Sequence, residues 1–259
     1  MEKIFIKNRY NKKIAVVVEE SQNSIGLVFV MHGLGDSKGS RHIRTFSNCF
    51  KDNNYTVVRF DATNTGGENS DNESDGVFED SNISTFYNDL EDVIAWAKKQ
   101  SFYKEPFILC GHSLGAISVA FYAENHPEEV KALAPISTVV NLNLSKETYT
   151  PEELENWEKT GWMTEDWGKI KVRIKWSYLQ EKEKYDLLKK ADKLTMPIFM
   201  MVGQFDDCTL PRHRQILFDE IGSGHKCLYM IPGAPHTFRK SEHLAEAYKL
   251  LDKWIKTLD

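Results

Sequence analysis

Residues 107–116 read Phe-Ile-Leu-Cys-Gly-His-Ser-Leu-Gly-Ala, and this stretch decides the fold. Its first four residues form a short apolar strand, and a helical pattern follows up to Asn125. Glycines stand two residues before and two after Ser113, where side chains would collide with the neighbouring strand and helix. A strand that turns sharply into a helix holds the serine oxygen exposed at the turn. We therefore expect Ser113 to be a nucleophile; the alternative is a serine that only caps the helix.

On both sides of this turn, short apolar strands alternate with amphipathic helices. Residues 27–31 are a continuous apolar run, suited to a strand that is buried on both faces. We expect strands over 3–8, 13–20, 24–31, 56–61, 107–110, 130–135, 198–202 and 227–231, and helices over 46–54, 84–100, 116–125, 212–221 and 242–258. This alternation predicts an α/β fold with a mostly parallel sheet and helices on both faces, in one domain over residues 1–259.

One segment interrupts the alternation. Residues 137–184 stand where a short connection would suffice, and they are rich in charged residues. They also hold four of the six tryptophans: Trp157, Trp162, Trp167 and Trp176. We expect a helical cap, or lid, inserted late in the catalytic domain. Its tryptophans either dock the cap onto the body or, in some cases, face the substrate, with Trp162 and Trp176 as the candidates to test.

A serine nucleophile on this type of turn needs a base, which should come last in chain order. His236 follows the final expected strand directly, in a loop from which an imidazole can reach Ser113. Three other histidines lie on or beside helices among polar neighbours, and we expect them at the surface: His213, His225 and His243. The sequence therefore predicts His236 as the base.

The acid should lie between nucleophile and base, and two neighbouring aspartates compete for this role. Asp206 is the third residue after Gly203, whereas a count back from Pro211 selects Asp207. Both counts use the spacing found in the enzymes that this chain resembles. We favour Asp206, because the glycine marks the strand end that positions the carboxylate, while an extra loop residue before the proline is easily accommodated. Asp207 would then cap a helix or loop.

Main-chain N–H groups should bind the oxyanion that forms when the serine attacks. One donor would be the amide of Leu114, at the positive end of the helix after the nucleophile. The second would be the amide of Leu34, in the His-Gly-Leu-Gly loop that follows the buried strand ending at Met31. We expect His32 and His112 to brace these loops by hydrogen bonding rather than to act as bases or ligands.

Composition excludes several other classes of protein. A hydrophobic fraction of 41% and a charged fraction of 27% argue against a disordered or fibrous chain. The 33 basic and 38 acidic residues give a net charge of −5, which argues against a nucleic-acid partner. No apolar run is long enough for a membrane span, and the first ten residues are too polar for a signal peptide. We expect a cytoplasmic protein.

Four cysteines are scattered without Cys-x-x-Cys spacing: Cys49, Cys110, Cys208 and Cys227. This pattern predicts reduced thiols rather than a zinc site or a redox pair.

The chain resembles the α/β-hydrolase superfamily, in the serine-aminopeptidase-like and monoacylglycerol-lipase-like branch, and within it the bacterial cinnamoyl/feruloyl esterases. The likeness rests on residues 32–38 (His-Gly-Leu-Gly-Asp-Ser-Lys), 59–61 (Arg-Phe-Asp), 74–80 (Ser-Asp-Gly-Val-Phe-Glu-Asp), the serine turn, the late insertion, the turn at 203–206 and the Gly-Ala-Pro-His loop. Relatives usually have Asp-x-x-Gly-His-Gly-x-Ser where residues 61–70 read Asp-Ala-Thr-Asn-Thr-Gly-Gly-Glu-Asn-Ser. This altered loop near the mouth of the site leaves the substrate open.

Together, the resemblance and the residues imply an α/β-hydrolase fold and a serine hydrolase with the triad Ser113, Asp206 and His236. Its expected substrate is a small-molecule carboxylic ester of a small or medium acyl or aromatic acid, cleaved through an acyl-enzyme without metal or cofactor. A thioesterase, a monoacylglycerol lipase and a small-peptide aminopeptidase are alternatives on the same triad. A ligand-binding module without catalysis is an alternative of another class. The sequence leaves open whether the chain forms a homodimer.

Overall fold

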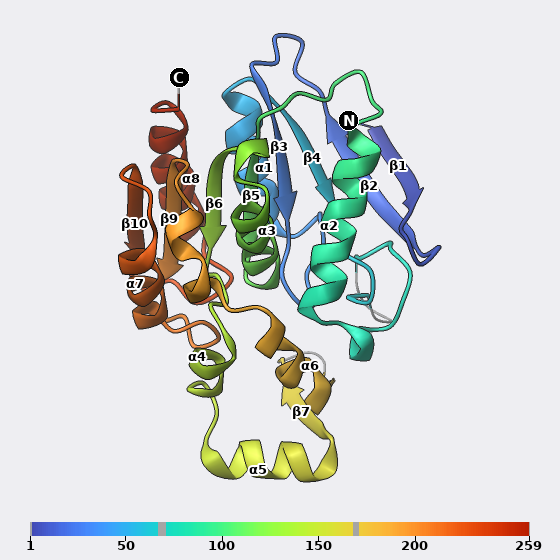
Figure 1. The fold of residues 1–259 in the computed structure, drawn as a ribbon, viewed down its shortest axis with the longest axis vertical. Coiled ribbons are helices and arrows are strands. Elements are labelled where there is room, and N and C mark those ends of the chain that lie inside the picture. The colour runs from blue at the N-terminus through green and yellow to red at the C-terminus, as the bar shows by residue number, and fades with distance from the viewer. Residues whose placement is uncertain (1, 67–70, 168–170, 259) are drawn as a thin grey trace.

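The computed structural model describes residues 2–66, 71–167 and 171–258, which build an eight-stranded sheet (Figure 1). The strand order is β1-β2-β4-β3-β5-β6-β9-β10. The first hairpin pairs antiparallel, as does β2 with β4, and every pairing from β4 to β10 is parallel. The strands are β1 (Glu2–Lys7), β2 (Lys13–Glu19), β3 (Gly26–Met31), β4 (Tyr55–Phe60), β5 (Phe107–His112), β6 (Val130–Ile136), β9 (Ile198–Gly203) and β10 (Lys226–Ile231). The expected mostly parallel sheet is confirmed.

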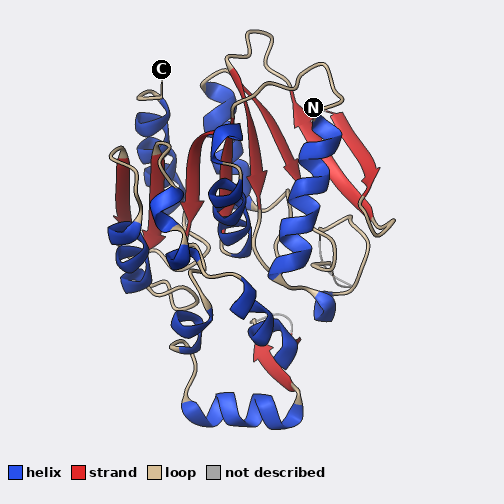
Figure 2. Cartoon of the chain, in the orientation of Figure 1, coloured by secondary structure: helices blue, strands red, loops and turns tan. Residues whose placement is uncertain are grey.

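Helices cover both faces of the sheet, as Figure 2 shows. On one face, α1 (Arg41–Asp52) and α8 (Ser241–Ile255) bury apolar side chains with the strands in one cluster. On the other face, α2 (Ile83–Ala97), α3 (Leu114–Asn125) and α7 (Pro211–Glu220) share a second cluster. β3 and β5 are buried along their whole length because helices cover both faces of the sheet, so neither face of these strands contacts solvent. This explains their continuous apolar runs.

The carboxyl ends of the parallel strands meet at one edge of the sheet. Register fixes this meeting: Met31 pairs with Gly111, Gly111 with Pro135, and Gly203 with Ile231. The loops that follow β3, β5, β9 and β10 therefore leave the sheet side by side. These are the loops on which the sequence places every candidate catalytic group.

The late insertion lies beyond this same edge, at the bottom of Figure 1. It contains α4 (Leu142–Lys146), α5 (Pro151–Thr160), α6 (Trp176–Glu181), the short turn η3 (Lys182–Lys184), and a hairpin of β7 (Trp162–Asp166) and β8 (Lys171–Lys175). Two more short turns, η4 (Leu187–Lys189) and η5 (Ala191–Lys193), connect it to β9. The remaining short turns, η1 (Phe78–Asp80) and η2 (Pro127–Glu129), belong to the body. The hairpin departs from the wholly helical cap that we expected. In β8 only Val172 and Ile174 are buried, and basic residues alternate with them. This alternation of buried and exposed side chains is typical of a strand, but it is too short to stand out in a charged sequence.

The cap has no core of its own. Its buried apolar side chains, including Trp157, Ile174 and Leu179, belong to the same cluster as α2 and α3. α5 is defined at both ends, by a capping box between Thr150 and Glu153 and by Gly161 in the left-handed region at φ +74°. The cap is thus anchored on the body through apolar contact.

Candidate active site

Ser113 occupies a strained turn between β5 and α3. Its backbone adopts φ +55° and ψ −115°, a conformation that L-residues rarely hold outside functional sites. A side chain on Gly115 would collide with the carbonyl of His32, and one on Gly111 would stand 2.5 Å from the Gly115 carbonyl oxygen. The two glycines thus permit the turn for the steric reason deduced from the sequence.

Asp206 and His236 lie together beside this turn. His236 Nδ1 is 2.9 Å from Asp206 Oδ2 and 3.0 Å from Oδ1. The carboxylate also accepts from the Thr209 amide at 2.8 Å and from the Thr209 hydroxyl at 2.9 Å. Burial opposes ionisation of Asp206, but the hydrogen bond and charge of His236 and the Thr209 amide lower its pKa to about 2. The acid is therefore ionised, and Nδ1 of the imidazole carries the proton it donates.

The neighbouring carboxylate points elsewhere. Asp207 is exposed, and among the described residues its carboxylate accepts a hydrogen bond only from the Cys208 thiol, at 3.5 Å. The expectation that Asp207 caps a loop is wrong, because Asp206 itself accepts from the Cys208 and Thr209 amides. A tight turn, in which the Asp206 amide bonds to the Gly203 carbonyl at 3.2 Å, brings Asp206 back toward the histidine loop.

The loop after β3 lies directly against the nucleophile. A Cβ on Gly33 would stand 2.8 Å from Cβ of Ser113, so this loop and the serine turn are in close contact. Within the described part of the chain, the N–H groups of Leu34 and Leu114 donate to no protein acceptor. An oxyanion requires main-chain donors of this kind, and the assignment of these two amides stays a prediction.

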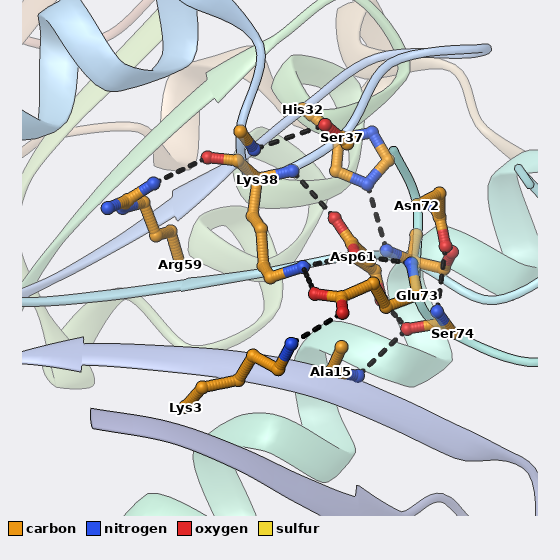
Figure 3. A network of polar contacts seen from close by, with 12 residues as sticks. Lys3, Ala15, His32, Ser37, Lys38, Arg59, Asp61, Asn72, Glu73 and Ser74 are labelled. Carbon is orange, nitrogen blue, oxygen red and sulfur yellow. Dashed lines mark hydrogen bonds and ion pairs between the residues drawn. The ribbon is translucent and has the colours of Figure 1, made fainter. Parts of the chain in front are cut away.

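A buried ion-pair network holds this loop in place (Figure 3). Asp61, at the end of β4, accepts from the Lys38 amide at 2.7 Å and from Lys38 Nζ at 2.6 Å. Its second oxygen also accepts from the Glu73 amide at 2.8 Å, and the Glu73 carboxylate is 2.8 Å from Lys38 Nζ. Both Lys38 and Asp61 are buried. The altered 61–70 loop thus begins at Asp61, which anchors the loop after β3 (called the oxyanion loop below, after its proposed role). Residues 67–70 lie outside the described residues.

The two loop histidines brace the backbone, as expected. His32 Nε2 accepts from the Ala62 amide at 2.9 Å, so its Nδ1 carries a proton and donates to the Gly33 carbonyl at 2.7 Å. His112 Nε2 donates to the carbonyl of His236 at 2.9 Å, which ties the residue before the nucleophile to the histidine loop. Burial lowers the pKa of both imidazoles, which keeps them neutral.

The remaining histidines correct an expectation. His213 and His243 are buried rather than at the surface. Nε2 of His213 is 3.0 Å from Glu147, a residue of the cap, which closes over it. Because Glu147 is far from His213 in the chain, the burial of His213 could not be predicted from its neighbours in α7.

The four cap tryptophans divide by position. Trp157 is buried and donates to the Ile174 carbonyl at 3.0 Å, and Trp176 packs against it with ring centroids 5.5 Å apart. Trp162 lies under the Arg173 guanidinium. The Trp167 ring lies against Gly35 in the loop after β3, where a side chain on the glycine would collide with it. That Trp162 or Trp176 faces the substrate stays a prediction.

Three groups of described residues are close enough to share a cation. The first is Asp36, His42 and His112, the second is Asp206, Cys208 and His236, and the third is His126, Glu128 and Glu129. In the second group the carboxylate and the imidazole are already paired with each other. All four cysteines carry free thiols. Across the described residues no helix is both long and apolar enough to cross a membrane.

Comparison with known proteins places this geometry in a family. The family model described as "Serine aminopeptidase, S33" matches residues 22–184. The mitochondrial palmitoyl-protein thioesterase ABHD10 of Pongo abelii is 26% identical over 191 residues, and that of Homo sapiens is 25% identical. In each case the match covers 71% of this chain and 58% of the curated relative, so it spans little more than half of those proteins.

Solved structures share the fold over nearly the whole chain. Est1E from Butyrivibrio proteoclasticus with bound ferulic acid superposes with a TM-score of 0.81 at 20% identity, covering 98% of both chains. Mouse alpha/beta hydrolase domain-containing protein 10 gives 0.81 at 19% identity, and a monoacylglycerol lipase from Paleococcus ferrophilus gives 0.72 at 18%, each covering all of both chains. These matches confirm the expected α/β-hydrolase fold. With the matched family model, they show that the chain belongs to the serine aminopeptidase (S33) family of hydrolases.

Proposed function

We propose that this chain is an esterase that cleaves a small-molecule carboxylic ester through an acyl-enzyme. The observation that carries the proposal is the Asp206–His236 pair, tied by the His112 hydrogen bond to the strained turn that presents Ser113. An ionised acid, an oriented imidazole and a partly exposed serine at a helix N-terminus are what acyl transfer requires.

The proposed first step forms the acyl-enzyme. With the proton of His236 on Nδ1, its Nε2 lone pair accepts the proton of Ser113 as Oγ bonds to the carbonyl carbon. The carbonyl oxygen becomes an oxyanion and accepts hydrogen bonds from the amides of Leu34 and Leu114. When the tetrahedral intermediate collapses, the C–O bond to the alcohol breaks, and the alcohol leaves with the proton held by His236.

Water completes the cycle by the same route. His236 takes a proton from water as the water oxygen attacks the acyl carbon, and the Ser113 oxygen leaves with that proton. The product is the free acid. No step calls on a metal or cofactor.

A thioesterase is the second candidate, because the curated relatives at 25–26% identity are named palmitoyl-protein thioesterases. The same triad serves both reactions, since only the leaving atom differs. We also propose that residues 137–184 act as a lid over the triad, and that the protein acts in the cytoplasm.

The test combines labelling with a substrate panel. A fluorophosphonate should label the parent protein and not Ser113→Ala, whose far-ultraviolet circular dichroism should match the parent. Nitrophenyl esters of increasing acyl length, a feruloyl ester, an acyl-thioester and an aminoacyl-anilide then separate the reaction classes. Loss of a triad nucleophile costs up to about 10⁶-fold in turnover. Ser113→Ala activity within about tenfold of the parent would contradict the mechanism.

A further inference from the structure

Lys182 is a buried lysine without a partner in the cap. It opens η3, directly after α6, and its side chain is only 5% exposed. Its Nζ lies 4.6 Å from the centroid of the Tyr178 ring. Within the described residues, neither a carboxylate nor another hydrogen-bond acceptor lies within bonding distance of this Nζ. A buried ammonium without a counter-ion lowers stability, so packing does not explain this residue.

Tyr178 lies next to this ammonium, Glu165 and Cys208 act on its charge, and Tyr149 acts on Tyr178. We call these five residues the cap cluster. Its members are Tyr149, Glu165, Tyr178, Lys182 and Cys208. Burial lowers the pKa of Lys182 to about 8, and the charges of Glu165 and then Cys208 oppose that shift. The two tyrosines lie in the same electrostatic field, since Glu165 and Cys208 act on both. Lys182 therefore still carries its charge at neutral pH.

The carboxylate nearest to Lys182 is already engaged. Glu165 accepts a hydrogen bond from Trp167 Nε1 at 2.8 Å, and Trp167 lies against the oxyanion loop at Gly35. Glu165 thus moderates the field at Lys182 without forming an ion pair with it. Glu165 also accepts a hydrogen bond from the Tyr149 hydroxyl. The Lys182 ammonium and the Tyr178 hydroxyl remain to meet an incoming acceptor.

The cap cluster reaches the proposed triad through Cys208. The Cys208 sulfur lies within 4.8 Å of an Asp206 oxygen and of a ring nitrogen of His236. Cys208 is exposed, and Ser113 and His236 are partly exposed. Cys208 also acts on the charge of Lys182, so this thiol lies near both the proposed triad and the buried ammonium.

We propose that Lys182 forms an anion-binding subsite and that the preferred substrate is an ester bearing a carboxylate on the part that lies beneath the cap. This inference rests on the proposed ester hydrolysis and names its substrate class. A carboxylate supplies the counter-ion that Lys182 lacks, with the Tyr178 hydroxyl as a further donor. The described cap cluster holds one lysine and no arginine fork, which suits a monoanion better than a phosphate.

Matched ester pairs test this proposal. 4-Nitrophenyl pentanoate and 4-nitrophenyl hydrogen glutarate differ by a carboxylate on the acyl side; 4-nitrophenyl butyrate and its 3-carboxy-4-nitrophenyl analogue differ on the leaving group. Lys182→Met should lower kcat/KM for a carboxylate-bearing ester by about 10- to 150-fold, the range of a charge-assisted hydrogen bond. The neutral partner should change by less than about threefold. Lys184→Met is the control, since Lys184 sits in the same short turn with 69% of its side chain exposed.

Two further readouts separate charge recognition from a structural effect. The preference of the parent enzyme for the carboxylate-bearing ester should fall as pH rises through about 8, because Lys182 then loses its proton. Lys182→Gln, which keeps a hydrogen-bond donor but no charge, should resemble Lys182→Met. Equal losses on charged and neutral esters, or a parent enzyme that prefers neither carboxylate-bearing ester, would overturn the proposal.

A binding experiment without turnover tests the anion-binding subsite separately from the proposed esterase function. If the parent cleaves none of the four esters, the proposed esterase function fails on its own. Calorimetry with free glutarate then tests the subsite directly. Binding to the parent and to Lys184→Met but not to Lys182→Met supports the subsite, whereas equal binding to all three proteins, or to none, refutes it.

Discussion

Replacing Asp206 by asparagine should invert the proton arrangement of the imidazole. Oδ1 of Asp206 accepts from the Thr209 amide at 2.8 Å, so an asparagine NH2 group cannot lie there without facing another donor. The amide nitrogen must then take the place of Oδ2, where it donates to His236 Nδ1, 2.9 Å away. The proton of His236 moves to Nε2, which can no longer accept from Ser113. A triad held in the wrong tautomer loses about 10⁴-fold in turnover.

The same substitution has a calculable cost in stability. The pKa of Asp206 falls from an ordinary 3.8 to about 2, so its ionised form stabilises the folded state. This contribution is fully present above the unfolded value and is lost as pH falls through about 2. A shift of this size is worth about 2 kcal/mol. Urea unfolding should show Asp206→Asn less stable by about that amount at pH 7, with the gap closing between about pH 4 and pH 2.

Asp207→Asn is the matched control. Its carboxylate is exposed and does not contact His236, so turnover should stay within about threefold of the parent. Both variants should be assayed by steady-state ester hydrolysis and by fluorophosphonate labelling. A large loss in Asp207→Asn with near-normal Asp206→Asn would refute the assignment of the acid while leaving a triad mechanism in place.

Three other predictions follow from the site. Hydrolysis should become faster with rising pH across the neutral range, because the proposed base must be neutral to accept the serine proton; a flat profile from about pH 5 to 9 would indicate another base or a step limited by the lid. Gly33→Ala should lower the acylation rate by about 100-fold in single-turnover experiments, because its Cβ would stand 2.8 Å from that of Ser113; an unchanged rate would show that the loop yields without harm. Lys182→Met should raise the free energy of unfolding at pH 7 by about 1–3 kcal/mol, with the difference shrinking from about pH 8 upward as the folded lysine of the parent loses its proton; a less stable variant would assign Lys182 a structural role.

Most of the body could be predicted from local sequence signals. β5 and the start of α3 follow from an apolar run, two glycines and a serine, because steric conflict at this turn leaves few other residue types. Asp206 could be chosen over Asp207 only through the glycine at the strand end, and the tight turn from Gly203 to Asp206 is the physical reason that this anchor holds. α1 begins at Arg41, five residues before the expected start at Phe46. Ser40 precedes it without a side-chain cap bond, so no capping signal marks this start.

Contacts between distant segments could not be predicted in this way. Glu147 covers His213 from the cap, so a histidine among polar neighbours is buried. Lys182 stands in a charged stretch typical of a solvated surface, and only the docking of the cap buries it. In both cases burial is decided by a partner far away in the chain, about which local periodicity carries no information.

The close contact between the loop after β3 and the serine turn has a consequence for how this enzyme can change over evolutionary time. Backbone meets backbone there: Gly115 against the carbonyl of His32, and Gly33 against Ser113. The spacing of the proposed oxyanion donors is thus fixed by the main chain, which single substitutions can hardly adjust. In our proposal the cap, by contrast, contacts the ligand through side chains, each replaceable without moving the backbone. Directed evolution should therefore find new acyl preferences in residues 137–184 within a few substitutions, while the glycines of the turn tolerate almost none.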